Sequence, residues 1–111
     1  MPLFAASARV RFRVKDPAGD LVKDANVSLA DKNYHPLRTL TTDQSGEVLF
    51  TNLSLGNLHF VAGATGFMVK YMEIPIHNYK ELKVVATLQV GLVGETVELH
   101  NHPKYKGWLQ Y

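Results

Sequence analysis

The sequence has no cysteine among its 111 residues, which excludes disulfide bonds and thiolate metal ligands. It has no apolar run near the roughly 18 residues that a membrane-spanning helix needs. Apolar residues at helical spacing are missing as well. The net charge of +2 is too small to indicate a nucleic-acid-binding protein. These absences favour a single small domain built from strands.

Alternation of apolar and polar residues is the strongest pattern that is present. From Arg9 to Lys15, the apolar side chains of Val10, Phe12 and Val14 face one way and the basic ones the other. Turn residues separate such segments at the spacing of about 8 to 12 residues that is typical of a β-sandwich or barrel. The predicted strands are residues 9–15, 25–30, 37–41, 47–51, 58–64, 69–76, 82–90 and 95–100.

Two local signals predict how these strands are arranged. In the turn at residues 42–46, the Asp43 carboxylate can bond to the turn backbone, and Gly46 tolerates a positive φ. Apolar alternation on both sides of this turn predicts a β-hairpin that pairs residues 37–41 with residues 47–51. Pro75 cannot donate a ladder hydrogen bond, so its strand is predicted to lie at a sheet edge.

The chain is expected to divide into a flexible N-terminus (residues 1–8), a β-sandwich domain (residues 9–100) and a C-terminal tail (residues 101–111). The N-terminus has a small-residue motif at residues 6–8 but no basic start or full apolar region, so no intact signal peptide is predicted. The core is predicted to hold Val10, Phe12, Val14, Val27, Leu29, Leu40, Val48, Phe50, Leu53, Leu58, Phe60, Val84, Ala86, Leu88 and Val97.

Short motifs follow one another in a fixed order along the chain: the strand and turn at residues 10–19, residues 21–29, the turn at residues 42–46, Phe50, Leu53, Gly56, Leu58, Phe60 and Gly66-Phe67. This ordered set resembles the carboxypeptidase regulatory-like domains, a transthyretin-like branch close to the collagen-adhesin B-type modules. The resemblance covers about residues 9 to 90. It implies an all-β, transthyretin-like (prealbumin/Cna-B-like) Greek-key sandwich of seven or eight strands.

The resemblance also implies a function without catalysis. Such modules accompany carboxypeptidases, outer-membrane receptors and surface proteins, and residues 90–99 look like the segment in which the module of outer-membrane receptors often ends. We therefore expect a structural or interaction module of a bacterial cell-envelope, periplasmic or extracellular protein. Its partner would be another protein or a domain of its parent chain. No cofactor, nucleic acid or membrane-spanning segment is predicted.

Arg9, Arg11, Arg13 and Lys15 form a basic stripe on one side of the first predicted strand. Neighbouring cations on one side of a strand lie roughly 7 Å apart and repel one another, so an anionic partner would stabilise them. The stripe is a candidate binding surface for phosphate, a lipid headgroup or an acidic protein. The alternatives are a solvated face whose charges meet Asp or Glu on an adjacent strand, or charges that deter pairing with another strand at a sheet edge.

Aromatic residues gather in the C-terminal tail, at Tyr105, Trp108 and Tyr111. They are candidates for stacking on a sugar or a peptide, and a carbohydrate-binding module is therefore an alternative function. The other possibility is that they fold back over one end of the sandwich, since aromatic side chains bury large areas.

Histidines raise two chemical alternatives. His100 and His102 are spaced to share one ion, although no third ligand is fixed and no native metal site is predicted. A transthyretin-like hydroxyisourate hydrolase is the other alternative, for which Arg38, His100, His102 and the terminal residues 105–108 are the matching positions. The chain departs from that enzyme at residues 11–13, which lack its first-strand histidine, and again at the C-terminus, where Lys106 replaces an arginine and Trp108 replaces a serine.

The adhesin resemblance implies one covalent possibility. B-type modules often form an isopeptide bond from a lysine near the end of the first strand, and Lys15 and Asn101 would be the reacting residues here. The strand that normally carries the catalytic acid has no carboxylate at residues 59–65. Lys15 is therefore expected to be a solvated charge.

Overall fold

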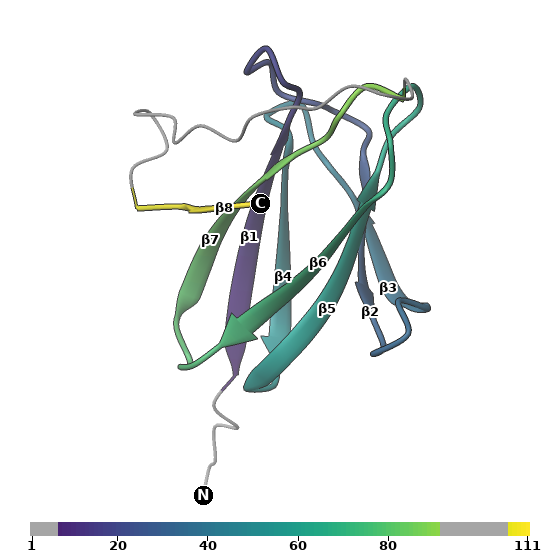
Figure 1. Ribbon diagram of the computed structural model, residues 1–111. Helices are drawn as coiled ribbons and strands as arrows, with labels where there is room; N and C mark the ends of the chain where they lie inside the picture. Colours follow the sequence, from purple (N-terminus) through teal and green to yellow (C-terminus); the bar gives the residue numbers. More distant parts are fainter. Residues whose placement is uncertain (1–6, 92–106) are drawn as a thin grey trace, which may run out of the picture.

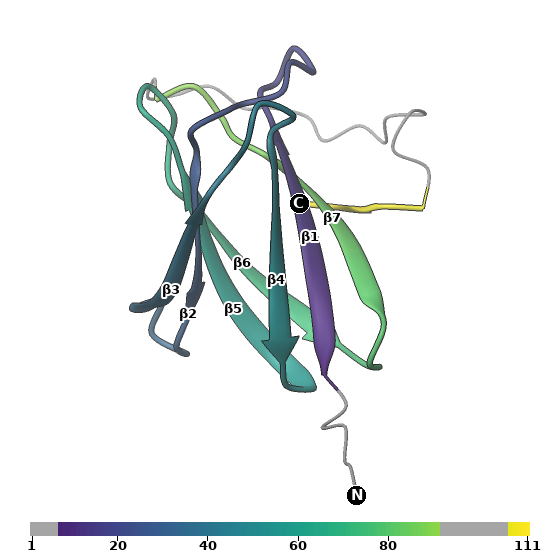
Figure 2. The ribbon, with the colours of Figure 1, turned by 180° about the vertical axis from the view of Figure 1, so that it is seen from behind.

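The computed structural model describes residues 7–91 and 107–111, in which the chain forms eight strands and no helix. The strands are β1 (Ala8–Lys15), β2 (Asn26–Ala30), β3 (Pro36–Thr41), β4 (Glu47–Leu53), β5 (Gly56–Gly63), β6 (Lys70–Ile76), β7 (Glu81–Thr87) and β8 (Leu109–Gln110). They make a first sheet of order β4-β1-β7-β8 and a second sheet of order β3-β2-β5-β6. The predicted all-β sandwich is confirmed, and Figure 1 and Figure 2 show its two layers from opposite sides.

Three phenylalanines join the sheets at the centre of the core. Phe12 of β1 and Phe50 of β4 come from the first sheet, and Phe60 of β5 comes from the second. Their ring centroids lie 4.8 to 5.9 Å apart in edge-to-face contacts. Such contacts add about 0.5–1.5 kcal/mol per pair to the hydrophobic burial. Alternation alone had placed all three inside, and all three are fully buried.

Most of the predicted core is buried, with two kinds of difference. Leu29, Leu40 and Leu58 pack against the core but are only partly buried. The prediction also left out the inward side of β6, where Met72, Ile74 and Ile76 are buried. The remaining predicted member, Val97, lies outside the described residues.

The predicted hairpin between residues 37–41 and 47–51 is wrong. Its turn forms as expected, because the Asp43 carboxylate accepts hydrogen bonds from the backbone N–H groups of Ser45 and Glu47. The strands on its two sides, however, join different sheets: β3 pairs with β2, and β4 pairs with β1. Alternation fixes which side of a strand is buried, but it does not determine the neighbour.

Strand ends near the C-terminus also differ from the prediction. The strand predicted for residues 82–90 ends at Thr87, and Val90 is half exposed in an isolated bridge to Phe67. The strand predicted for residues 95–100 lies outside the described residues. The short strand β8 was not predicted, and it runs parallel to β7 at the edge of the first sheet.

The first sheet places β1 between two partners. β1 is antiparallel to β4 and parallel to β7, with pairs that run from Arg9↔Glu81 to Lys15↔Thr87 in the parallel ladder. In the second sheet, β6 lies at an edge, as Pro75 predicted. The basic stripe of β1 therefore lies in the middle of the outer face of the first sheet.

Candidate interaction surface

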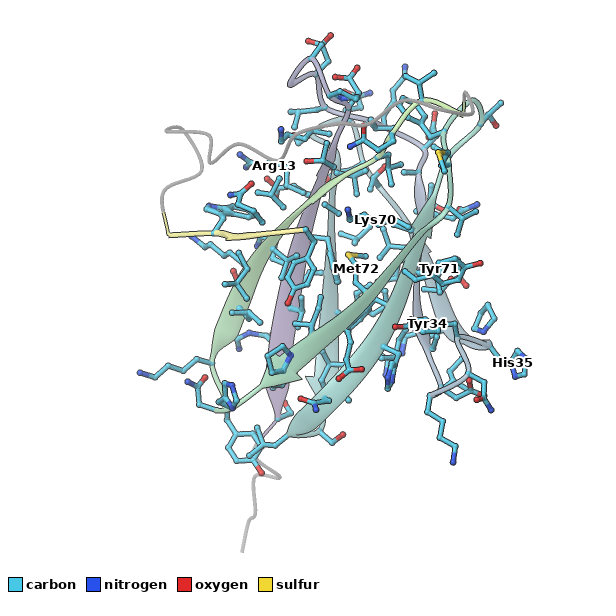
Figure 3. All side chains as sticks on the ribbon, viewed as in Figure 1. Arg13, Tyr34, His35, Lys70, Tyr71 and Met72 are labelled. Carbon is cyan, nitrogen blue, oxygen red and sulfur yellow. The ribbon has the colours of Figure 1, made fainter. Side chains whose placement is uncertain are left out.

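The outer face of the first sheet carries most of the residues that the sequence singled out. Val10, Phe12 and Val14 are fully buried, so the alternate side chains of β1 point outward between those of β4 and β7. We define the basic face as Arg9, Arg11, Arg13, Glu47, Glu81, Lys83 and Trp108. Figure 3 shows Arg13 on this side of the molecule, away from Tyr34 and Tyr71.

Two glutamates separate the arginines of this face. Glu81 of β7 lies 3.0 Å from Arg11 Nε and 3.9 Å from Arg9 Nε. Glu47 of β4 accepts hydrogen bonds from Arg11 Nη1 at 3.3 Å and from Arg13 Nε at 2.9 Å, and it also contacts Arg13 Nη2. The alternative in which the basic stripe meets carboxylates on adjacent strands is therefore confirmed for these three arginines.

The pairing changes the protonation behaviour of both partners. The hydrogen bond to Glu81 raises the pKa of Arg11, and the same contact lowers the pKa of Glu81. Both groups are thus held in their charged forms. Among the described residues, the four cations Arg9, Arg11, Arg13 and Lys83 lie on this face with two carboxylates, so this part of the chain gives the face an excess of positive charge.

The ring of Trp108 packs against two cations of the basic face, Arg13 and Lys83. The guanidinium carbon of Arg13 is 4.9 Å from the centroid of its ring, and Lys83 Nζ is 5.7 Å from it. Both contacts are cation–π interactions, worth roughly 0.5–1 kcal/mol at exposed sites. Trp108 and Tyr111 therefore fold back onto the sandwich, and the Tyr111 hydroxyl donates to the Glu73 carbonyl of β6 at 3.4 Å. Tyr105 lies outside the described residues.

Lys15 is buried, unlike the three arginines of β1. Only 7% of the residue is exposed, so the prediction that Lys15 is a solvated charge is wrong. The end of β1 is covered there, since Lys15 forms an isolated bridge with Leu21 and its carbonyl accepts from the Leu88 N–H. Asn101, the other residue of the isopeptide possibility, lies outside the described residues, so that bond stays a prediction.

The metal and hydrolase alternatives gain little support from the described residues. His100 and His102 lie outside them, and within residues 7–91 and 107–111 no group of three or more His, Asp or Glu could hold a metal ion. Arg38, the mid-chain position of the hydrolase resemblance, donates to the Thr51 carbonyl at 2.9 Å. It therefore links β3 to β4 at the open side of the sandwich.

Sequence reasoning missed three members of the basic face. Glu47 and Lys83 occupy outward positions of predicted strands, which is the signal that was available, whereas Glu81 lies one residue ahead of the strand predicted for residues 82–90. The contacts of Glu47 and Glu81 with the arginines depend on strand order, which alternation does not reveal. Among the described residues, no helix is long and apolar enough to cross a membrane.

Comparison with known proteins agrees with this architecture. Residues 9–89 match the model of the carboxypeptidase regulatory-like domain, nearly the range over which the motifs resemble that family. No curated protein matches the chain in sequence.

Similar solved structures share the fold at low sequence identity. The Streptococcal ancillary pilin is 18% identical with a TM-score of 0.59, over 78% of this chain and 33% of the pilin. BcpA, the major pilin subunit of Bacillus cereus, is 16% identical with a TM-score of 0.64, over 74% and 28%. Catechol 1,2-dioxygenase from Acinetobacter radioresistens is 10% identical with a TM-score of 0.66, over 96% and 58%.

This chain thus spans less than two thirds of each of these structures. At such identities the likeness extends to the β-sandwich alone, because the same fold supports unrelated functions. The family match covers most of the described residues and includes the segments whose strand and turn motifs resemble that family. The chain belongs to the carboxypeptidase regulatory-like domain family.

Proposed function

We propose that this chain is a non-catalytic interaction module that binds an acidic protein surface through the basic face. The partner is another protein or a second domain of the parent chain. The family match supports a module of the regulatory type. The observation that carries the proposal is the set of four cations that, among the described residues, lie beside two carboxylates and one tryptophan on one face of the sheet.

The organisation of this face suits recognition of acidic groups. Glu47 and Glu81 hold the arginines at fixed spacing, so little side-chain entropy remains to be lost on binding. Lys83 is exposed, and the Arg9 side chain is half exposed and lies 3.9 Å from Glu81. These two cations are the most available for a partner's carboxylates. Trp108 adds apolar area of the kind that is common at the centres of interfaces.

A titration with a hexaglutamate peptide tests this proposal. Backbone and Trp108 indole N–H resonances of the basic face should shift, and the shifts should weaken as salt is added. The double variant Arg9→Glu/Lys83→Glu should lose the interaction. The double variant Lys23→Glu/Lys32→Glu makes the same charge change outside the basic face and should keep the interaction. Equal loss in both variants would show attraction to net charge alone and would refute a defined site.

The cellular context is part of the same proposal. We infer that the parent protein belongs to the bacterial cell envelope or is secreted, and an accessory domain of an outer-membrane receptor is the concrete version. The similarity of residues 90–99 to the segment in which the modules of such receptors often end supports it. Fractionation of source cells with an antibody against the domain tests this context. Recovery of the protein only with the cytoplasm would overturn it.

A sugar platform at the C-terminal aromatics is less favoured. Trp108 already lies against Arg13 and Lys83, which supports a role within the basic face rather than stacking on a sugar ring.

A further inference from the structure

A second group of aromatic side chains lies on the outer face of the second sheet. His59 of β5 and Glu73 of β6 are directly paired across the two strands, and Tyr71 follows on the same side of β6. Tyr34 reaches this face from the connection between β2 and β3. Its ring centroid lies 5.2 Å from that of His59 and 5.1 Å from that of Tyr71, both edge to face. We define the tyrosine face as Tyr34, His59, Tyr71 and Glu73, and Figure 3 shows its two tyrosines side by side.

The loop that carries Tyr34 is held in one conformation. The Asp31 carboxylate accepts hydrogen bonds from the N–H groups of Asn33 and His35, and the Asp31 carbonyl accepts from the Tyr34 N–H. Tyr34 has a φ of +62°, a left-handed conformation that costs a residue with a side chain roughly 1–2 kcal/mol. Strain of this kind persists where the surroundings fix it, and it is concentrated at functional sites. The strained backbone positions the Tyr34 ring between His59 and Tyr71.

Exposure and charge distinguish this face from the basic face. Tyr71 is 61% exposed, Glu73 is exposed, and Glu73 Oε1 lies 3.4 Å from His59 Nε2. The other outward positions of the second sheet's strands are divided between hydroxyl or amide side chains and uncharged apolar residues or glycine: Asn26, Ser28, Thr39, Thr41 and Asn57 are of the first kind, and Ala30, Leu37, Val61, Gly63 and Pro75 are of the second. Lys70 and Arg38 share the inward side of their strands with Met72 and Leu40, so none of the described strands places a cation on this face.

We propose that the tyrosine face binds a neutral saccharide. The exposed Tyr71 ring offers a surface on which the apolar C–H face of a sugar ring can pack. The Glu73 carboxylate can accept hydrogen bonds from two sugar hydroxyls, and His59 and the nearby hydroxyl and amide groups supply further partners. Lys32 and His35 are exposed in the loop that carries Tyr34, but the described strands place no lysine or arginine on this face, and an anionic ligand would meet Glu73 there. The strand residues of the face therefore favour an uncharged ligand.

The experiment is a titration of the isotope-labelled chain with neutral oligosaccharides, followed by backbone and side-chain N–H resonances. Maltohexaose, cellohexaose, xylohexaose, mannohexaose and chitohexaose form the panel of probes. At least one should shift the resonances of Tyr71, His59 and Glu73. In Tyr71→Ala, the affinity should fall about tenfold, as expected from the loss of one aromatic stacking contact.

Tyr79→Ala is the matched control. Tyr79 is 52% exposed and lies in the connection between β6 and β7, beyond the other end of β6. The Tyr79→Ala variant should bind the sugar with the affinity of the unaltered chain. Tyr71→Ala should keep the dispersed spectrum of a folded chain, since Tyr71 points away from the core.

Three results would overturn the proposal. In the first, no sugar of the panel shifts the resonances of the tyrosine face. In the second, the shifts survive in Tyr71→Ala or appear at Trp108. In the third, a heptalysine peptide shifts this face and the sugars do not, which would make it a docking site for a basic protein segment. The hexaglutamate titration of the basic face is independent of all three.

Discussion

Replacement of Gly46 by alanine tests how closely the turn at residues 42–46 packs against β1. Gly46 has a φ of +70° at the end of the turn that leads into β4. Its carbonyl accepts a hydrogen bond from the Val14 N–H at 2.8 Å. A Cβ at this position would lie 2.9 Å from the Val14 carbonyl oxygen and 3.1 Å from Leu21 Cβ. Because the oxygen belongs to the backbone of β1, it cannot rotate away as a side chain would.

The expected cost has two parts. A left-handed conformation costs alanine roughly 1–2 kcal/mol relative to glycine. Displacement of the Val14 carbonyl would also weaken its hydrogen bond from the Val22 N–H, at about 1 kcal/mol. Alanine also reduces the conformational entropy of the unfolded chain, which stabilises the folded state by about 0.4–1 kcal/mol. The net loss in the free energy of unfolding should be about 2 kcal/mol, measured by urea unfolding.

Gly66→Ala separates the two parts. Gly66 has a φ of +88°, and an added Cβ there would meet no atom within 4 Å. This control should lose only the conformational part, about 1 kcal/mol or less. If Gly46→Ala were no more destabilised than Gly66→Ala, the contact with β1 would not restrict this position, and the reasoning would be refuted.

Three further substitutions test the core, a buried hydroxyl and the ion pairs. Phe60→Ala should cost about 3–5 kcal/mol in urea unfolding, and Leu55→Ala at an exposed position should stay within about 0.5 kcal/mol of the unaltered chain. Thr42→Val keeps the shape but leaves the Ala25 N–H without the acceptor that lies 2.8 Å away, so a loss of about 1–3 kcal/mol is expected. The pKa of Glu81 is lowered in the folded chain, so its contribution is present above its unfolded pKa and is lost as the pH falls through the folded value. Glu81→Gln should therefore be less stable than the unaltered chain at pH 7, and this difference should shrink on acidification; a difference that stays constant would contradict the assignment.

Alternation predicted which side of each strand is buried. It predicted that Phe12, Phe50 and Phe60 are buried without any knowledge of strand pairing, because a strand with one solvated face buries every second residue. The edge position of β6 was also predictable, since Pro75 lacks an N–H. These features depend only on residues close together in the chain.

Strand order depends on contacts between distant residues, and there the sequence was insufficient. The sequence of the turn before Glu47 is compatible both with a hairpin between β3 and β4 and with a crossover in which β4 pairs with β1. The Arg13–Glu47 and Arg11–Glu81 pairs follow only from the actual order. Tyr34 was not predicted as part of any site, because neither its positive φ nor its ring contacts leave a local signal in a polar loop.

The parallel ladder between β1 and β7 has a mechanical consequence. Tension applied ahead of Ala8 and beyond Thr87 would act along the strands from opposite ends of the ladder. All of its hydrogen bonds would then be sheared together, whereas a hairpin pulled from its open end unzips one bond at a time. A module held at these two points would therefore resist unfolding by a stretching force.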